Sequence, residues 1–129
     1  MPRPVHFEIH ATDPERAITF YTTVFDWTFE RWDNAPYWLI STGDGPGIDG
    51  GLVPRQGPPP DEDAPLNAYP STIEVDDLDT IVRHVRQAGG KVVVPRCAIP
   101  RIGWLAYCTD TEGNLFGLLQ PDENATRVP

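Results

Sequence analysis

Polar and apolar residues alternate near the start of the chain, in the stretch VHFEIH at positions 5–10. A β-strand points successive side chains to opposite faces, so the two histidines and Glu8 would share one face. Apolar residues occupy the positions between them. The pattern predicts a strand that turns its apolar face towards a core and its polar face towards solvent or a ligand.

The spacing of the apolar residues then changes to that of a helix. Asp13 is suited to cap a helix and Pro14 to occupy its first position. Apolar residues follow at the spacing i, i+3, i+4 and i+7, at Ala17, Phe20, Tyr21 and Val24. This spacing predicts a helix with one face packed on a sheet. Strand-like segments come next, at 27–32, at 37–43 and after the turn in GDGPGIDGGLVPR (43–55).

The same order of patterns returns in the second half of the chain. STIEVDD (71–77) alternates like a strand, with Asp77 as a candidate helix cap. A helical stripe follows at Leu78, Ile81, Val82 and Val85, and it stops at Gly89 and Gly90. Three further strands are predicted at 91–95, 103–110 and 114–120, with the turn DTEGN (110–114) before the last. The chain thus repeats one β-α-β-β-β unit.

We therefore expect an α+β fold in which two tandem β-α-β-β-β modules form a curved mixed sheet around a cleft. The single domain would span residues 1–129. Its parts are a first module (1–53), a proline-rich acidic linker (54–67), a second module (68–121) and a C-terminal tail (122–129). The linker carries three consecutive acids among prolines and glycines, which excludes a regular element.

Composition narrows the choice of function. Ten basic and 19 acidic residues give a net charge of −9, which would repel nucleic acid. This charge favours neutral or cationic small ligands, or simply keeps the protein soluble. Cys97 and Cys108 lack a CxxC spacing and predict neither a disulfide framework nor a zinc knuckle. The sequence contains neither an apolar run of membrane length nor an N-terminal signal peptide, so we expect a cytoplasmic protein without a membrane partner.

Four stretches of the chain together resemble the vicinal oxygen chelate (VOC) superfamily, which includes glyoxalase I, bleomycin-resistance proteins and extradiol dioxygenases. The stretches are VHFEIHATDPERAITFYTTVFDW, GGLVPR, IEVDDLDTIVRHVRQAGGKVVVP and DTEGNLFGLLQ. The resemblance implies paired modules around a small-molecule site. It does not fix the reaction, because the scaffold serves lyases, isomerases, dioxygenases, transferases and non-catalytic binders.

The resemblance also implies four positions for metal ligands. His6 matches the first. The others fall at Gly117, at Pro70 or Thr72, and at or beside Gly50 and Gly51, where Asp49 is the nearest carboxylate. One good ligand of four is too few for tight binding, since affinity comes from several donors together. We therefore expect no complete metal site, and only His6 matches a family ligand.

Several residues are candidates for a site on the polar strand faces. Glu8 and Glu74 occupy matching positions in the two modules, and a desolvated carboxylate there could act as a general acid or base. The alternative is that both are simply solvated or hydrogen-bonded. The predicted ligand contacts are His6, Tyr37, Trp38, Thr72, Trp104, Leu115, Gly117 and Leu119. An aromatic wall with few polar groups is typical of a small-molecule pocket.

Three functions remain open. The leading hypothesis is a protein that binds a small apolar or cationic organic molecule in the inter-module cleft without a metal. The alternative is a glyoxalase-type lyase or isomerase, or a dioxygenase, with a divalent cofactor (Ni, Zn, Mn or Fe) on His6 and nearby carboxylates. The third is an interaction or regulatory module with a vestigial cleft. We expect a homodimer, in which the modules pair within one chain or swap between chains.

Overall fold

The computed structural model describes residues 3–62 and 69–126, which contain two β-α-β-β-β modules. The first consists of β1 (His6–Ala11), α1 (Pro14–Phe25), β2 (Thr28–Arg31), β3 (Trp38–Ser41) and β4 (Asp49–Pro54). The second consists of β5 (Thr72–Glu74), α2 (Leu78–Gln87), β6 (Lys91–Ile99), β7 (Gly103–Thr109) and β8 (Leu115–Pro121). The α+β class and the tandem repeat are confirmed.

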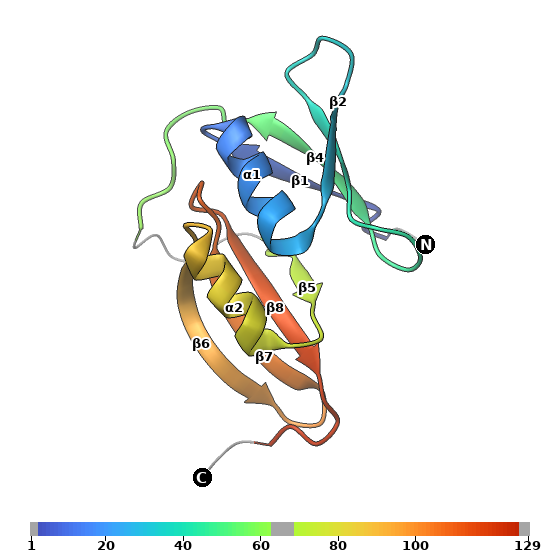
Figure 1. Cartoon of the computed structure of the whole chain (residues 1–129), viewed down its shortest axis with the longest axis vertical. Helices are drawn as coiled ribbons and strands as arrows, with labels where there is room; N and C mark the ends of the chain where they lie inside the picture. Colours follow the sequence, from blue (N-terminus) through green and yellow to red (C-terminus); the bar gives the residue numbers. More distant parts are fainter. Residues whose placement is uncertain (1–2, 63–68, 127–129) are drawn as a thin grey trace.

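Each module contains one four-stranded mixed sheet. The strand orders are β1-β4-β3-β2 and β5-β8-β7-β6, so the two sheets have the same topology. The first and last strand of each module are parallel neighbours, and the other pairs are antiparallel. In Figure 1 each helix lies in front of its own sheet, with one module above the other.

Local sequence explains where both helices begin. The Asp13 side chain accepts a hydrogen bond of 3.2 Å from the backbone N–H of Arg16 at the start of α1. Asp77 accepts one of 3.2 Å from Thr80 at the start of α2. Both predicted caps are therefore confirmed, and each satisfies a backbone donor that the helix itself leaves unpaired.

The two modules share one hydrophobic core. Phe20 and Tyr21 of α1 lie against Phe116 of β8, with ring centroids 6.1 and 6.3 Å apart. Phe116 is only 3% exposed and belongs to the core. Helix α1 thus packs on both sheets and joins the modules.

Strand β6 is longer than predicted. It continues through Pro95 to Ile99, and its pairing with β7 is irregular between Val92 and Cys97. Proline cannot donate to a ladder, and an irregularity in the pairing accommodates it within a strand. Of the predicted linker, residues 55–62 have no regular structure and residues 63–67 lie outside the described part of the chain, as do 127–129 of the predicted tail.

Neither helix in the described residues has the length and apolar character that a membrane crossing requires.

Candidate functional site

Each sheet has one face that its helix covers and an opposite face, which we call the open face. The open face of the first sheet carries His6, Glu8, Tyr37, Leu39, Asp49 and Gly51. That of the second carries Thr72, Glu74, Leu105, Tyr107, Leu115, Gly117 and Leu119. Most of the predicted site residues therefore lie on open faces.

On the first open face, a tyrosine covers the glycine of the last strand. The Tyr37 hydroxyl lies where a Cβ on Gly51 would be, so Gly51 leaves room for this ring. The same hydroxyl lies 3.2 Å from Nε2 of His6. The structure thus brings His6 and Tyr37 together as a polar pair.

The second open face has a related arrangement around Gly117. Thr72 is the Cα partner of Gly117 across the β5–β8 pair. A Cβ on Gly117 would lie 2.9 Å from the Thr72 hydroxyl oxygen and 3.3 Å from the Tyr107 ring. The place of the missing side chain is therefore partly filled by Thr72 and Tyr107.

The two predicted tryptophan contacts lie on the helix-covered faces instead. Trp38 and Trp104 are partly buried against the hydrophobic core. The Arg31 guanidinium lies 5.5 Å from the Trp38 ring centroid. Arg96 lies 4.2 Å from that of Trp104, whose indole N–H also donates to Asp122. The structure does not bring either tryptophan together with the open-face residues.

The two candidate catalytic carboxylates are likewise not brought into one cavity. Glu8 pairs with His10 at 2.7 Å and lines the cavity described next. Glu74 lines a separate hollow beside the start of α2, together with Asp76 and Asp77.

A cavity of about 450 Å³ lies between the modules. Its floor consists of buried side chains from both modules, namely Ile9, Tyr21, Trp27 and Phe116. The partly buried Phe7, Ile73 and Leu115 form its walls. The exposed rim includes Glu8, His10, Asp61 and Glu62. Of the residues predicted from the sequence, Glu8 and Leu115 line this cavity.

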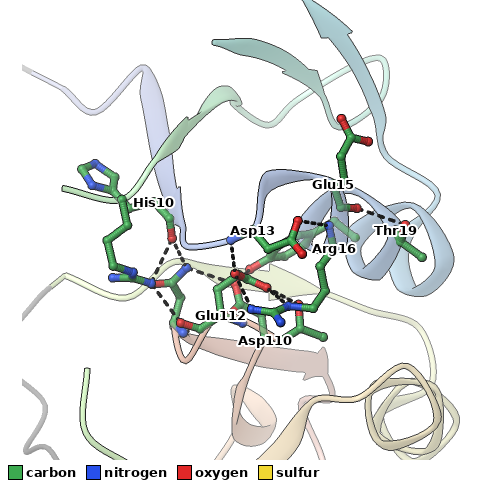
Figure 2. A network of polar contacts seen from close by, with 11 residues as sticks. His10, Asp13, Glu15, Arg16, Thr19, Asp110 and Glu112 are labelled. Carbon is green, nitrogen blue, oxygen red and sulfur yellow. Dashed lines mark hydrogen bonds and ion pairs between the residues drawn. The ribbon is translucent and has the colours of Figure 1, made fainter. Parts of the chain in front are cut away.

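A buried polar cluster beside the cavity holds the modules together (Figure 2). Glu112, in the β7–β8 turn, accepts from Arg16 of α1 at 2.7 and 3.0 Å and from the backbone N–H of Asp13 at 2.8 Å. Burial alone would raise the pKa of Glu112. Hydrogen bonds from Arg16, Asp13 and Thr111 outweigh burial, so its pKa lies below the ordinary value.

A second carboxylate in the same turn anchors the cavity floor. Asp110 is 4% exposed and accepts a 2.7 Å hydrogen bond from the Tyr21 hydroxyl. Burial raises the pKa of Asp110, and bonds from Tyr21, Asn114 and the Glu112 backbone offset part of the rise. Burial also raises the pKa of Tyr21 well above its ordinary value, so this hydroxyl remains a donor.

Arg55 ties the start of the linker to the same turn. Its Nη2 donates to the carbonyl oxygens of His10 and Glu112 and to Oδ1 of Asn114, at 2.9–3.0 Å. Its Nε is buried without a hydrogen-bond partner among the described residues. Sequence reasoning missed this cluster, because DTEGN was read only as a turn, although two acids in one turn were a signal.

The comparisons with known proteins now identify the family. The family model of the glyoxalase/bleomycin resistance protein/dioxygenase superfamily matches residues 3–118. The chain belongs to this superfamily. The resemblance and the two-module fold described above agree with this membership.

Two relatives within the superfamily show how far the likeness extends. A "Glyoxylase-like domain-containing protein" of Didymella fabae is 34% identical over 117 residues, 86% of this chain and 88% of that protein. "Putative glyoxylase CFP32" of Mycobacterium tuberculosis is 29% identical over 127 residues, 94% of this chain. The chain spans about half of that relative's length, 46%.

Two solved structures share the fold of this chain. The fosfomycin resistance protein FosX from Mesorhizobium loti has a TM-score of 0.68 at 20% identity, covering 95% of this chain and 94% of that one. TnmS3, an antibiotic binding protein from Streptomyces sp. CB03234, has a TM-score of 0.64 at 22% identity, covering 95% and 98%. At these identities the likeness concerns the fold alone.

The metal site implied for the superfamily does not fit the residues present here. In the strand register, His6 pairs with Asp49 and Thr72 with Gly117, which supplies one imidazole and one carboxylate. The Asp49 carboxylate accepts from the backbone N–H and hydroxyl of Thr42 at 2.9 and 3.1 Å. Within residues 3–62 and 69–126, no three His, Cys, Asp or Glu side chains converge as a metal site would require.

Proposed function

We propose that the chain binds a small organic molecule, apolar or cationic, in the cavity between its modules, without a metal ion. The observation that carries the proposal is the cavity of about 450 Å³ with its buried aromatic floor. Small-molecule sites typically have volumes of about 300–1,000 Å³, mostly apolar walls and a few polar groups. The net charge of −9 supports a neutral or cationic guest over an anion.

The names of the structural neighbours support a screen that includes antibiotics. TnmS3 is named as an antibiotic binding protein, and FosX as a fosfomycin resistance protein. They do not identify the ligand of this chain, because they share its fold at low identity.

The proposal is tested by filling the cavity. Metal-stripped protein is screened by thermal shift, because a ligand that binds only the folded state raises Tm, and hits are titrated by calorimetry. Leu115→Trp replaces a leucine of the cavity wall by a larger aromatic side chain and should abolish binding. Leu105→Trp is the matched control, since Leu105 lies on the same open face and is not among the residues that line the cavity.

Absence of any hit from the folded protein, or equal binding by both tryptophan variants, would overturn the proposal.

The predicted ligand contacts on the open faces stay predictions. His6, Tyr37, Thr72, Gly117 and Leu119 are not among the residues that line the cavity. Tyr37→Phe and His6→Ala should therefore change the affinity of a cavity ligand less than Leu115→Trp does. The same variants report on a ligand that binds the open face instead.

A metal-dependent glyoxalase-type or dioxygenase activity is the second candidate function. One observation favours it, namely that His6 and Asp49 are Cα partners on adjacent strands. Turnover of a hemithioacetal or catechol panel that rises with added metal and collapses in His6→Ala would support it. The absence of turnover with nickel, zinc, manganese or iron(II) would remove it.

Homodimer formation and a cytoplasmic location also remain predictions. A second copy could cover the open face of the second sheet, where Leu105, Leu115 and Leu119 are partly exposed. Sedimentation velocity should then give the mass of two chains, and a single-chain mass at micromolar protein would contradict the dimer.

A further inference from the structure

Aromatic side chains line the floor and one wall of the inter-module cavity. Tyr21 and Trp27 are stacked with centroids 5.2 Å apart and planes 2° from parallel. Phe7 lies 5.6 Å from Trp27. The Tyr21 hydroxyl already donates to Asp110, so it does not need a partner from a ligand. Such a floor suits a flat aromatic guest, whose ring can pack against these rings in stacked or edge-on geometry.

The rim of the same cavity is acidic. Glu8, Asp61 and Glu62 are exposed there. Two of these acids have basic partners at 2.7 Å, His10 for Glu8 and Lys91 for Glu62. Both partner side chains are well exposed, 45% and 67%, and exposed ion pairs are weak enough for a ligand cation to replace one.

One guanidinium, that of Arg55, also lines the cavity. Its Nη2 donates to three oxygens of the protein, and its Nε is buried. This Nη2 is therefore held against the β7–β8 turn. Among the cavity-lining residues, the carboxylates of Glu8, Asp61 and Glu62 outnumber this guanidinium, which favours a cation over an anion at the mouth.

We propose that the cavity selects a planar aromatic amine, with its ring against the aromatic side chains of Phe7, Tyr21 and Trp27 and its cationic nitrogen at the rim of Glu8, Asp61 and Glu62. The inference rests on the proposed function, because it names the class of molecule that the same cavity takes. Two interactions favour a cationic ring in this cavity. Aromatic faces attract cations, and the carboxylates of the rim attract them as well.

The experiment uses three tricyclic probes of similar size and different charge. Proflavine is cationic, acridine is neutral at mildly alkaline pH, and acridine-9-carboxylate is anionic. Their affinities for the whole chain are measured by calorimetry at low and high salt. We expect proflavine to bind about tenfold tighter than acridine and the carboxylate to bind weakest, with the preference reduced at high salt.

Two double variants test whether the rim carboxylates cause the preference for proflavine over acridine. The double variant Asp61→Asn, Glu62→Gln should remove most of the proflavine preference and leave acridine binding unchanged. The control, Asp44→Asn with Glu123→Gln, removes the same charge from exposed positions that are not among the cavity-lining residues. Leu115→Trp should weaken all three probes.

The outcomes separate this inference from the proposed function. If all three probes bind alike in the wild type and weaken in Leu115→Trp, the cavity binds small molecules and the amine preference is wrong. If both double variants reduce the preference equally, bulk charge causes it and the role of the rim is overturned. If no probe binds the folded protein, the inference fails, and the screen of the metal-stripped protein decides the proposed function separately.

Discussion

Replacing Glu112 by alanine should weaken the contact between the two modules. The Glu112 side chain is 0% exposed and accepts from Asp13, Arg16 and Thr111 at 2.7–3.0 Å. A hydrogen bond to a charged group contributes about 1.5–3 kcal/mol, and these bonds are not additive because the donors can rehydrate. Arg16 is 51% exposed and regains water readily. We therefore expect the free energy of unfolding to fall by about 3 kcal/mol, which is near the low end of the cost of breaking a buried ion pair.

Urea denaturation followed by circular dichroism and tryptophan fluorescence measures this loss, which should appear as a lower midpoint with an unchanged slope. The matched control is Glu15→Ala, because Figure 2 shows the Glu15 carboxylate pointing away from the network. Removing this acid from the first turn of α1 should cost only about 0.3–1 kcal/mol. In thermal unfolding, Glu112→Ala should lower Tm by about 10 °C.

A double-mutant cycle between Glu112→Ala and Arg16→Ala isolates their interaction. The reasoning would be refuted if Glu112→Ala were no less stable than Glu15→Ala, or if the two changes were fully additive. The first result would mean that packing of α1 on Phe116 holds the modules together without help from Glu112, and the second that Arg16 and Glu112 do not stabilise each other.

Three further predictions follow from the buried groups. Because the pKa of Glu112 is lowered by folding, its contribution to stability is complete above the ordinary value of 4.5 and is lost as pH falls through the pKa of the folded state. Urea midpoints should therefore drop more steeply in acid for the wild type than for Glu112→Gln, and parallel profiles would contradict this. Burial raises the pKa of Cys108 to about 11, so iodoacetamide at neutral pH should label only the exposed Cys97. Two labels on the native protein in mass spectrometry would contradict this prediction. A Cβ at Gly117 would lie 2.9 Å from the Thr72 hydroxyl, so Gly117→Ala should cost about 1 kcal/mol in urea, and Gly117→Glu should not create a nickel site detectable by titration.

Local sequence signals were sufficient for most of the fold. The Asp13-Pro14 pair and Asp77 fix where the helices begin, through interactions within a few residues. Strand alternation places Phe116 in the core and Gly117 on the opposite face, because neighbouring side chains in a strand point in opposite directions. These features depend on periodicity, which the sequence contains directly.

The site could be predicted less well, because its residues meet across the chain. Trp104 and Tyr107 point to opposite faces of β7, and the order of residue types alone did not reveal which of these faces meets the core. Arg16 and Glu112 are 96 residues apart, and Tyr21 and Asp110 are 89 apart. No local spacing indicates such pairs, and the cavity they border depends on how the modules pack.

The central claim, a metal-free ligand site between the modules, is tested most directly by a crystal structure of metal-stripped protein with the tightest hit of the screen. We predict ligand density against Trp27 and Phe116, beside Leu115. Density on the open face beside His6 and Asp49, with a metal ion required for binding, would contradict the claim.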